Sequence, residues 1–218
     1  MTTPATLLLV DQLCERYPTL TTVKPAIEDA CNQMIACYEN GGKILVCGNG
    51  GSCSDSDHIV GELMKSFELK RPIPSELQEK LAAIDPERGS YLASHLQQGL
   101  PAISLMAHTA LITAVANDID GEVIFAQQVI GYGRPNDILI GISSSGNSRN
   151  VLDACLVAKA MNLKVIGLTG ETGGRIKGLC DVLINVPGRR TAFVQELHLP
   201  VYHLLCLVIE QHFFGQTD

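Results

Sequence analysis

The sequence predicts an α/β fold in which a parallel sheet is covered by helices on both faces. Five short, apolar, β-rich runs follow one another along the chain, at residues 43–48, 101–106, 137–143, 164–170 and 181–187. Segments with helical periodicity separate these runs. Near-continuous apolar strands that alternate with helices are typical of a parallel sheet buried on both faces. A chain of 218 residues can bury a core of its own, so we expect one domain spanning residues 1–218.

The helices are predicted from apolar residues that recur every three to four positions. Residues 1–40 fit two helices that precede the sheet, interrupted near Tyr17-Pro18 because proline disfavours a helix interior. Further helices are expected at residues 58–67, 109–116, 123–132, 151–161 and 191–214. The last of these is long and amphipathic, and it closes the fold.

The segment 70–99 interrupts this alternation with the pattern of an inserted helical hairpin. The run from Ser75 to Gln78 resembles a capping box, Asp85-Pro86 predicts a second helix start, and Gly99 is a candidate helix end. The high charge of the segment favours a solvated surface excursion. A lid or a subunit contact near the site is the alternative.

Composition and charge exclude several functional classes. The formal net charge is −7, so an anionic ligand must be held by local donors, and nucleic acid is not an expected partner. The N-terminus lacks the features of a signal peptide and no run approaches membrane-spanning length, so we expect a cytoplasmic protein without membrane contact. Eight cysteines without a CxxC pair favour reduced thiols, with Cys53 notable for its place in a Gly-rich turn.

The first expected strand runs into Gly48-Asn49-Gly50-Gly51-Ser52. Ligands of open parallel sheets bind beyond the carboxyl ends of the strands, where this turn lies. Its glycines let backbone N–H groups approach a ligand, and Asn49 and Ser52 add polar side chains. A tight turn without a ligand is the alternative, because the motif is neither GxGxxG nor a P-loop.

The third expected strand ends in residues 143–148, which read SSSGNS. Four hydroxyl groups at the start of a helix form a neutral cup rich in hydrogen-bond donors, and the helix dipole favours negative charge there. The cup consists of Ser143, Ser144, Ser145 and Ser148. Helix capping is the alternative, but a cap needs only one such residue. The turn therefore predicts a phosphate site.

Two helices carry candidate acid–base and metal-binding side chains. His58 and Glu62 are four residues apart, so both project from one face of a helix, although such pairs are common in helices without function. The last helix adds Gln195, His198 and His203, and histidines among leucines and valines are usually buried core or interface residues. Because candidate side chains occur on both helices, the interpretation as an acid–base or metal-binding site becomes stronger.

These features together resemble the SIS (sugar isomerase) domain family, and within it the sedoheptulose 7-phosphate isomerases, or phosphoheptose isomerases. The matching stretches are GNGGS followed by HxxxEL, NDxxxExxFxxQV (117–129), GRPNDILIGISSSGNSRNV (133–151), KVIGLTGETGG (164–174), CDVLINVP (180–187) and TAFVQELHLPVYHLLC (191–206). They extend from about Lys43 to the C-terminus, apart from residues 70–99. Their order, spacing and polar residues all agree with the family.

The resemblance implies a doubly wound, five-stranded sheet of flavodoxin-like order, and a homotetramer whose active sites lie between subunits. It implies one zinc ion per site, with ligands matching His58, Glu62, Gln195 and His203. Glu62 and His203 match the acid–base residues. The positions that match phosphate or other substrate contacts are Asn49, Gly50, Gly51, Ser52, Asp118, Ser143, Ser144, Ser145, Ser148, Thr191 and Gln195.

The spacing of two of these ligands raises a geometric problem. Gln195 and His203 are eight residues apart, which places their Cα atoms about 12 Å apart along a regular helix. Either Pro200 distorts the helix, or the ligands come from different subunits. We favour ligands from different subunits, since the resemblance implies sites at an interface.

The implied reaction moves a proton between the first two carbons of a sugar through an enediol. It needs a base at carbon, a proton donor and acceptor for the oxygens, and stabilisation of the developing charge. We expect Glu62 to be the base and His203 the proton shuttle. The expected reaction converts sedoheptulose 7-phosphate to D-glycero-D-manno-heptose 7-phosphate.

Two other functions fit parts of the pattern. Family members commonly carry an arginine one turn beyond the glutamate, where this chain has Ser66 beside Lys65, and the insertion follows directly. An isomerase or sensor for another sugar phosphate is therefore an alternative. A second alternative is a non-catalytic adaptor that binds the replication initiator protein, but such adaptors lack the residues that match Glu62 and His203.

Overall fold

A computed structural model describes residues 4–215, which form a five-stranded parallel sheet between two helical layers. The strands are β1 (Ile44–Gly48), β2 (Ala102–Ser104), β3 (Ile138–Ser143), β4 (Lys164–Gly170) and β5 (Val182–Val186). Their order is β2-β1-β3-β4-β5, and every neighbouring pair is parallel. The predicted doubly wound α/β fold with flavodoxin-like strand order is therefore confirmed.

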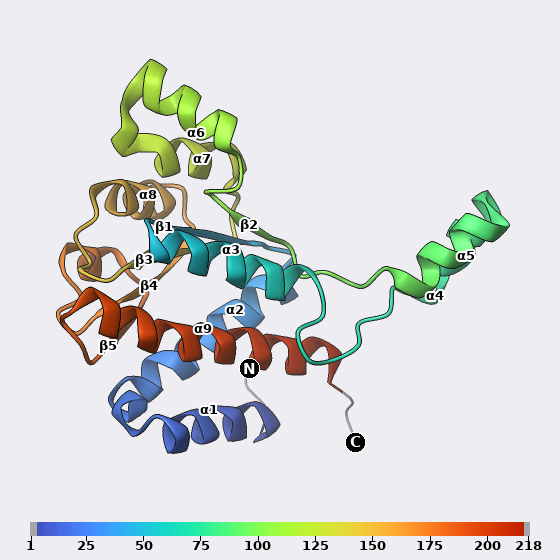
Figure 1. Ribbon diagram of the computed structural model, residues 1–218, viewed down its shortest axis with the longest axis horizontal. Coiled ribbons are helices and arrows are strands. Elements are labelled where there is room, and N and C mark those ends of the chain that lie inside the picture. Colours follow the sequence, from blue (N-terminus) through green and yellow to red (C-terminus); the bar gives the residue numbers. More distant parts are fainter. Residues whose placement is uncertain (1–3, 216–218) are drawn as a thin grey trace.

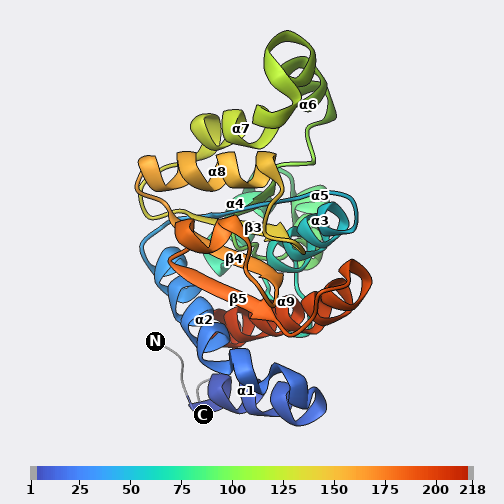
Figure 2. The same cartoon turned by 90° about the vertical axis from the view of Figure 1, so that its left-hand side faces the viewer.

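Helices cover both faces of this sheet, as Figures 1 and 2 show. One face carries α2 (Lys24–Glu39), α3 (Gly51–Met64) and α9 (Thr191–Phe214), with α1 (Pro4–Arg16) packed outside them. The other face carries α7 (Ile124–Tyr132) and α8 (Arg149–Ala160), beyond which lies α6 (Thr109–Val115). A 3-10 segment (Pro18–Val23) separates α1 from α2, and another (Arg175–Leu179) precedes β5.

Side chains along each strand point alternately to the two faces of the sheet, so a separate hydrophobic core lies on each face. Ile44 and Val46 of β1 point into the core beneath α2, α3 and α9. Leu45 and Cys47 point into the core beneath α7 and α8. Because successive side chains of a strand face opposite sides, a strand that is buried on both faces is apolar throughout. This burial explains the uninterrupted apolar runs in the sequence.

Helix α9 is a 24-residue core helix that contains Pro200 without interruption. Its most apolar window has a mean hydropathy of 1.5, so by length and composition it could cross a membrane. The expectation that no apolar run reaches this length is wrong for this helix. Half of that window is buried within the domain, where Val201, Leu205 and Ile209 pack in the core. Burial against the sheet accounts for the hydropathy of α9.

The segment between α3 and β2 forms the predicted helical hairpin, with helices α4 (Ser75–Ile84) and α5 (Pro86–His95). Figure 1 shows it projecting from the body of the molecule. The start of α5 is as predicted, because the Asp85 side chain accepts hydrogen bonds from the backbone N–H groups of Glu87 and Arg88. Apart from Gly89, the two helices contain no buried residue.

Two other predictions for this segment are wrong. Pro74, rather than Ser75, caps α4, and no side chain caps its N-terminus; the Gln78 amide instead donates to the carbonyl of Ile73. Helix α5 ends before Leu96, so Gly99 is not its cap. A Cβ at Gly99 would lie 2.8 Å from the carbonyl oxygen of Met64, so glycine is needed there for close packing.

All eight cysteines are free, which agrees with the prediction of reduced thiols. Burial raises the pKa of Cys31 and of Cys47 to about 12, so both thiols stay protonated. Cys53 is partly exposed, and its pKa is also raised, first by burial and then by the charge of Asp57. Because the thiolate is the reactive form, Cys53 is not an activated nucleophile.

Candidate active site

The strand order places a crevice where the chain turns away from β1 and β3 in different directions. The turn after β1 begins α3, and the turn after β3 begins α8. The side-chain amides of Asn49 and Asn150 exchange two hydrogen bonds of 2.8 and 3.0 Å across this crevice. The structure thus brings the Gly-rich turn and the serine turn together.

Glycines in the first turn serve two purposes. A Cβ at Gly48 would lie 2.6 Å from the carbonyl oxygen of Ser52, and one at Gly51 would lie 2.5 Å from Nε2 of Gln195. These two glycines are explained by close packing within the chain. Gly50 has a φ of 58° and open space where a Cβ would be, so its backbone is the part of the turn that a ligand can approach. Ser52 is buried beneath the turn.

The serine turn is held by its own hydrogen bonds and by β4. The hydroxyls of Ser143 and Ser148 lie 3.0 Å apart, and the hydroxyl of Ser145 accepts from the backbone N–H of Asn147. The carbonyl of Ser144 accepts from the N–H of Gly170 at the end of β4. Ser143 is buried and Ser145 is exposed, so the cup opens toward solvent on the Ser145 side.

The capping alternative for this turn is not supported. Ser148 occupies the N-cap position of α8, but its side chain makes no capping hydrogen bond and contacts Ser143 instead. Ser148 thus faces the neighbouring hydroxyl rather than the helix amides, and the N–H of Val151 donates to Oδ1 of Asn150 instead. This arrangement suits a phosphate group.

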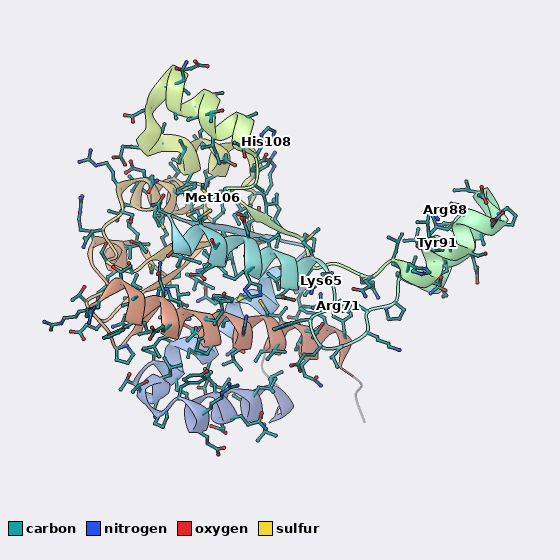
Figure 3. The ribbon with its side chains drawn as sticks, in the orientation of Figure 1. Lys65, Arg71, Arg88, Tyr91, Met106 and His108 are labelled. Carbon is teal, nitrogen blue, oxygen red and sulfur yellow. The ribbon has the colours of Figure 1, made fainter. Side chains whose placement is uncertain are left out.

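Glu62 lies near the C-terminal end of α3, between the side chains of His58 and Lys65. Its Oε1 is 3.2 Å from Nε2 of His58, and its Oε2 is 2.8 Å from Nζ of Lys65. The Glu62 side chain is only 12% exposed, whereas that of His58 is 42% exposed. Glu62 is therefore a largely buried carboxylate that a ligand can reach past an accessible imidazole. Figure 3 shows Lys65 at the end of α3, close to Arg71.

His203 of α9 stands beside this pair. Its ring centre lies 4.9 Å from that of His58, and its buried Nε2 has no hydrogen-bond partner among residues 4–215. Burial lowers the pKa of His203, and the neighbouring His58 lowers it further against the opposing effect of Glu62. A neutral imidazole with an unpartnered nitrogen can accept or donate a proton. His203 also lines a cavity of about 470 Å³ between α1 and α9.

Three nearby side chains escaped the sequence interpretation. Tyr202 lies between His58 and Asp55, with its hydroxyl within hydrogen-bond distance of both. Nothing in the sequence indicates this contact, because it depends on how α9 packs against α3. The place of Lys65 could be found from the sequence, since it stands three positions after Glu62, directly after the last residue of α3.

Gln195 lies away from the other candidate metal ligands of the same chain. Its side chain covers Gly51, at the start of α3, while His58 is seven residues farther along that helix. Seven residues correspond to about 10 Å along the helix axis. Helix α9 continues through Pro200, so Gln195 and His203 lie on one helix, eight residues apart.

The donor set fits a divalent ion, but one chain does not complete it. No group of three or more His, Cys, Asp or Glu side chains within residues 4–215 is arranged to hold a metal. The facing atoms of His58 and Glu62 and the unpartnered Nε2 of His203 are nitrogen and oxygen donors of the kind that zinc accepts. Within the described part of one chain, these side chains therefore offer suitable donor atoms but are not arranged as a three-ligand site.

Two predicted substrate contacts lie apart from Glu62. Thr191 is exposed at the first residue of α9, on the edge of the sheet that carries the serine turn. Asp118 is exposed in a π-helical turn (Ala116–Asp120) after α6, where the Asn117 side chain donates to it. Figure 1 shows α6, which leads into the turn with Asp118, across the sheet from α9, which carries His203.

Comparison with known proteins places these features in a family. The family model described as SIS domain matches residues 10–99 and 89–170. A phosphoheptose isomerase of Helicobacter pylori (strain P12) is 39% identical over 194 residues, which is 89% of this chain and 88% of the relative. A phosphoheptose isomerase of Laribacter hongkongensis is 36% identical over 94% of this chain and 93% of its own.

Solved structures agree with these sequence matches. The phosphoheptose isomerase from Francisella tularensis superposes with a TM-score of 0.74 at 36% identity, over 90% of this chain and 91% of its own. Phosphoheptose isomerase GmhA from Neisseria gonorrhoeae gives a TM-score of 0.71 at 33% identity, over 93% and 91% of the two chains. The similarity therefore extends over nearly the whole fold.

Proposed function

Because the chain belongs to the phosphoheptose isomerase family of SIS domain proteins, we propose that it converts sedoheptulose 7-phosphate to D-glycero-D-manno-heptose 7-phosphate. The observation that carries this proposal is the Glu62 carboxylate, held between His58 and Lys65 beside the neutral His203. An adaptor without catalytic activity has no need for a buried carboxylate in this setting.

In the proposed reaction, Glu62 removes the proton from one carbon and returns it to the neighbouring carbon. His203 donates a proton to the carbonyl oxygen and takes one from the hydroxyl of the enediol. Its lowered pKa suits this role, because a neutral imidazole can act in both directions near neutral pH. The ammonium group of Lys65, 2.8 Å from Oε2, holds the Glu62 carboxylate in place.

The serine turn would hold the phosphate at the far end of the sugar. Its hydroxyls are neutral donors, and the dipole of α8 adds attraction for the dianion. This binding energy orients the reacting carbons without taking part in the chemistry.

We also propose that His58, Glu62 and His203 hold a divalent ion, with Gln195 supplied by another subunit. Zinc fits the donor set, as do other divalent ions that accept nitrogen and oxygen ligands. When bound, the ion would supply Lewis-acid polarisation of the substrate carbonyl.

A homotetramer with active sites between subunits is the proposed assembly. Within one chain, Glu62 lies eleven residues beyond Gly51, or about 16 Å along α3 from the turn that contacts the serine cup. Apolar surface also lies exposed near His203, including Leu199, which is 42% exposed at the rim of the cavity. Both features support a neighbouring subunit that completes the site. A cytoplasmic location stays a prediction.

The test is a coupled assay of the purified protein, loaded with zinc, on a panel of ketose phosphates that includes sedoheptulose 7-phosphate. Substituting Glu62→Gln or His203→Ala should lower kcat/KM by about 10²- to 10⁴-fold, as expected for loss of an acid–base residue. Glu15→Gln is a matched control, because Glu15 is exposed on α1 away from the crevice.

The outcomes separate the competing functions. Absence of turnover on every sugar, with folding and zinc content intact, would exclude the proposed enzymatic function. Faster turnover of a pentose or hexose phosphate than of the heptulose would leave the reaction type standing and overturn the substrate. Equal activity of Glu62→Gln and Glu15→Gln would remove Glu62 from the mechanism.

A further inference from the structure

Tyr202 is a buried α9 residue whose hydroxyl lies inside the candidate active site. Its side chain is 2% exposed, and it faces α3. The hydroxyl oxygen is 3.0 Å from Nδ1 of His58 and 3.3 Å from Oδ1 of Asp55. On its other side, His58 presents Nε2 to Glu62 at 3.2 Å. A chain of polar contacts therefore leads from Asp55 through Tyr202 and His58 to Glu62.

One hydroxyl hydrogen cannot serve both contacts of Tyr202. The acceptor Oδ1 of Asp55 takes this hydrogen, because a carboxylate is the stronger acceptor and has no hydrogen of its own to offer. The hydroxyl oxygen must then accept from His58, which places the imidazole hydrogen on Nδ1. The lone pair of the second imidazole nitrogen, Nε2, then faces Oε1 of Glu62 at 3.2 Å, a contact between two acceptors that becomes favourable when both bind a shared cation.

Asp55 supports this interpretation by its own environment. Its Oδ2 is buried and has no hydrogen-bond partner within the described chain. A buried carboxylate with an unsatisfied oxygen destabilises a fold, so its presence needs a reason. Orientation of a histidine through a bridging hydroxyl would be such a reason.

We propose that Tyr202, held by Asp55, is a positioning residue that fixes the His58 ring with its hydrogen on Nδ1 and its Nε2 free to bind a divalent ion. The inference rests on the proposed role of His58 as a metal ligand. Histidines that bind metals generally donate their other N–H to an oxygen acceptor, which sets the tautomer and the ring orientation. Here the tyrosine hydroxyl is that acceptor.

The competing interpretation is that Tyr202 only fills the core. Its ring contacts the rings of His58 and His203 edge-on, and a phenylalanine could keep both contacts. Without the hydroxyl, however, His58 could carry its hydrogen on Nε2 and donate it to Glu62, as in an ordinary helix pair. That arrangement would block the nitrogen that the ion needs. The two interpretations therefore differ in the tautomer of His58.

Tyr202→Phe removes the hydroxyl alone, and Tyr38→Phe is the matched control. Tyr38 also has a partly buried ring and a hydroxyl that donates to a backbone carbonyl, that of Pro101, away from the crevice. Zinc affinity of each protein is measured by competition with a chromophoric chelator. Loss of the acceptor behind a metal-bound histidine weakens metal binding by about 10- to 100-fold. We expect this loss for Tyr202→Phe, and less than about a twofold change for Tyr38→Phe.

A second readout needs neither metal nor substrate. Two-bond proton–nitrogen NMR of metal-free, ¹⁵N-histidine-labelled protein reports which ring nitrogen carries the hydrogen. The spectrum is taken at about pH 8.5, two units above the ordinary histidine pKa of about 6.5. His58, assigned by the loss of its signal in His58→Gln, should carry hydrogen on Nδ1 in the natural protein and in Tyr38→Phe. In Tyr202→Phe the Nε2–H form should appear.

These measurements separate this inference from the proposed function. An unchanged His58 tautomer and equal zinc affinities in both tyrosine variants would overturn the role of Tyr202, even if the isomerase is active. A tautomer change with weaker zinc binding, confined to Tyr202→Phe, would support it even if no heptulose is converted. If the natural protein binds no zinc, the tautomer alone decides whether Tyr202 positions His58.

Discussion

At the scale of single residues, His198 links burial to stability. It is fully buried in α9, where its Nε2 donates to the carbonyl of Thr169 at 3.2 Å. Burial lowers its pKa to about 4, and the hydrogen bond to Thr169 only partly offsets this effect. The native protein therefore keeps His198 neutral at pH values where the unfolded chain binds a proton.

The sign of the resulting pH dependence follows from proton binding. Between the unfolded pKa of 6.5 and the native pKa of about 4, the unfolded state holds the extra proton, so unfolding becomes easier as pH falls. The contribution of His198 is fully present above pH 6.5 and is lost toward pH 4. A shift of this size corresponds to about 3 kcal/mol.

His198→Gln should remove this pH dependence, because the glutamine amide can still donate to Thr169 and does not titrate. The measurement is urea unfolding of both proteins at one fixed protein concentration, at several pH values across this window. We expect the free energy of unfolding of the natural protein to fall more steeply on acidification. Parallel curves for the two proteins would mean that His198 is protonated equally in the native and unfolded states.

The sequence predicts the contacts of a single side chain well only when its partner is close along the chain. The pairing of His58 with Glu62 follows from helical spacing, and the structure places the two side chains together. The contact of His58 with Tyr202 spans 144 positions and exists only because α3 and α9 run side by side. Spacing rules cannot supply such a contact.

At the scale of elements, a buried ion pair fixes the end of α3. Arg71 and Glu210 are almost completely buried, and Nε of Arg71 is 2.7 Å from Oε1 of Glu210. The Arg71 guanidinium also donates to the backbone carbonyls of Glu62 and Leu63, the last turn of α3. Glu210 accepts from three consecutive backbone N–H groups, those of residues 67–69. The pair thus ties the helix that carries Glu62 to the end of α9.

Glu210→Gln should destabilise the protein strongly, because it leaves the Arg71 cation buried without its carboxylate. Burial alone would raise the pKa of Glu210, but the three N–H donors and Arg71 outweigh it and lower the pKa. Breaking one side of such a pair costs about 3–5 kcal/mol in the free energy of unfolding.

The matched control is Glu76→Gln, which breaks the exposed ion pair between Glu76 and Lys80 on the hairpin. Exposed pairs of this kind contribute less than about 1 kcal/mol. Both variants are compared with the natural protein by guanidinium unfolding. A Glu210→Gln protein no less stable than Glu76→Gln would show that water or rearrangement satisfies Arg71.

The sequence predicts the helices and strands of this fold well where hydrophobic periodicity is strong. It predicts them poorly where contacts outside the element determine the residue at which the element begins or ends. The apolar strands and the helix at 191–214 agree closely with the structure, because burial sets both patterns. The expected cap at Ser75 and helix end at Gly99 are wrong, because the chain at both positions is fixed by contacts with Ile73 and Met64. Near Ser75 another short-range hydrogen bond, from Gln78 to Ile73, replaces the expected cap, whereas at Gly99 nonlocal packing against Met64 overrides the local signal.

At the scale of the whole molecule, the proposed site divides into two parts that one chain keeps apart. The serine cup, at the start of α8, and Gln195 lie beside the turn that begins α3, and Glu62 with His203 lies near the end of α3. The offset of about 16 Å along the helix favours substrate binding between the cup of one subunit and the acid–base residues of another. The homotetramer that the family resemblance implies would allow this arrangement.

Complementation between two inactive chains tests that arrangement. Glu62→Gln removes the base but keeps the serine cup, while Ser145→Asp places a negative charge on the exposed side of the cup and should repel the phosphate. Each chain alone should be inactive. In a mixed oligomer, a site that takes its cup from one subunit and its base from another has both parts intact in about a quarter of random pairings.

The two variants are coexpressed with different affinity tags and purified through both tags, so that every oligomer contains each chain. Recovery of about a quarter of the natural activity would support sites shared between subunits, since a site built within one chain always lacks one of the two residues. Activity no higher than that of the separate variants would mean that cup and base belong to the same chain. In that case α3 and α9 must shift to bring Glu62 to the phosphate-bound sugar, and the fourth metal ligand cannot be the Gln195 of a neighbour.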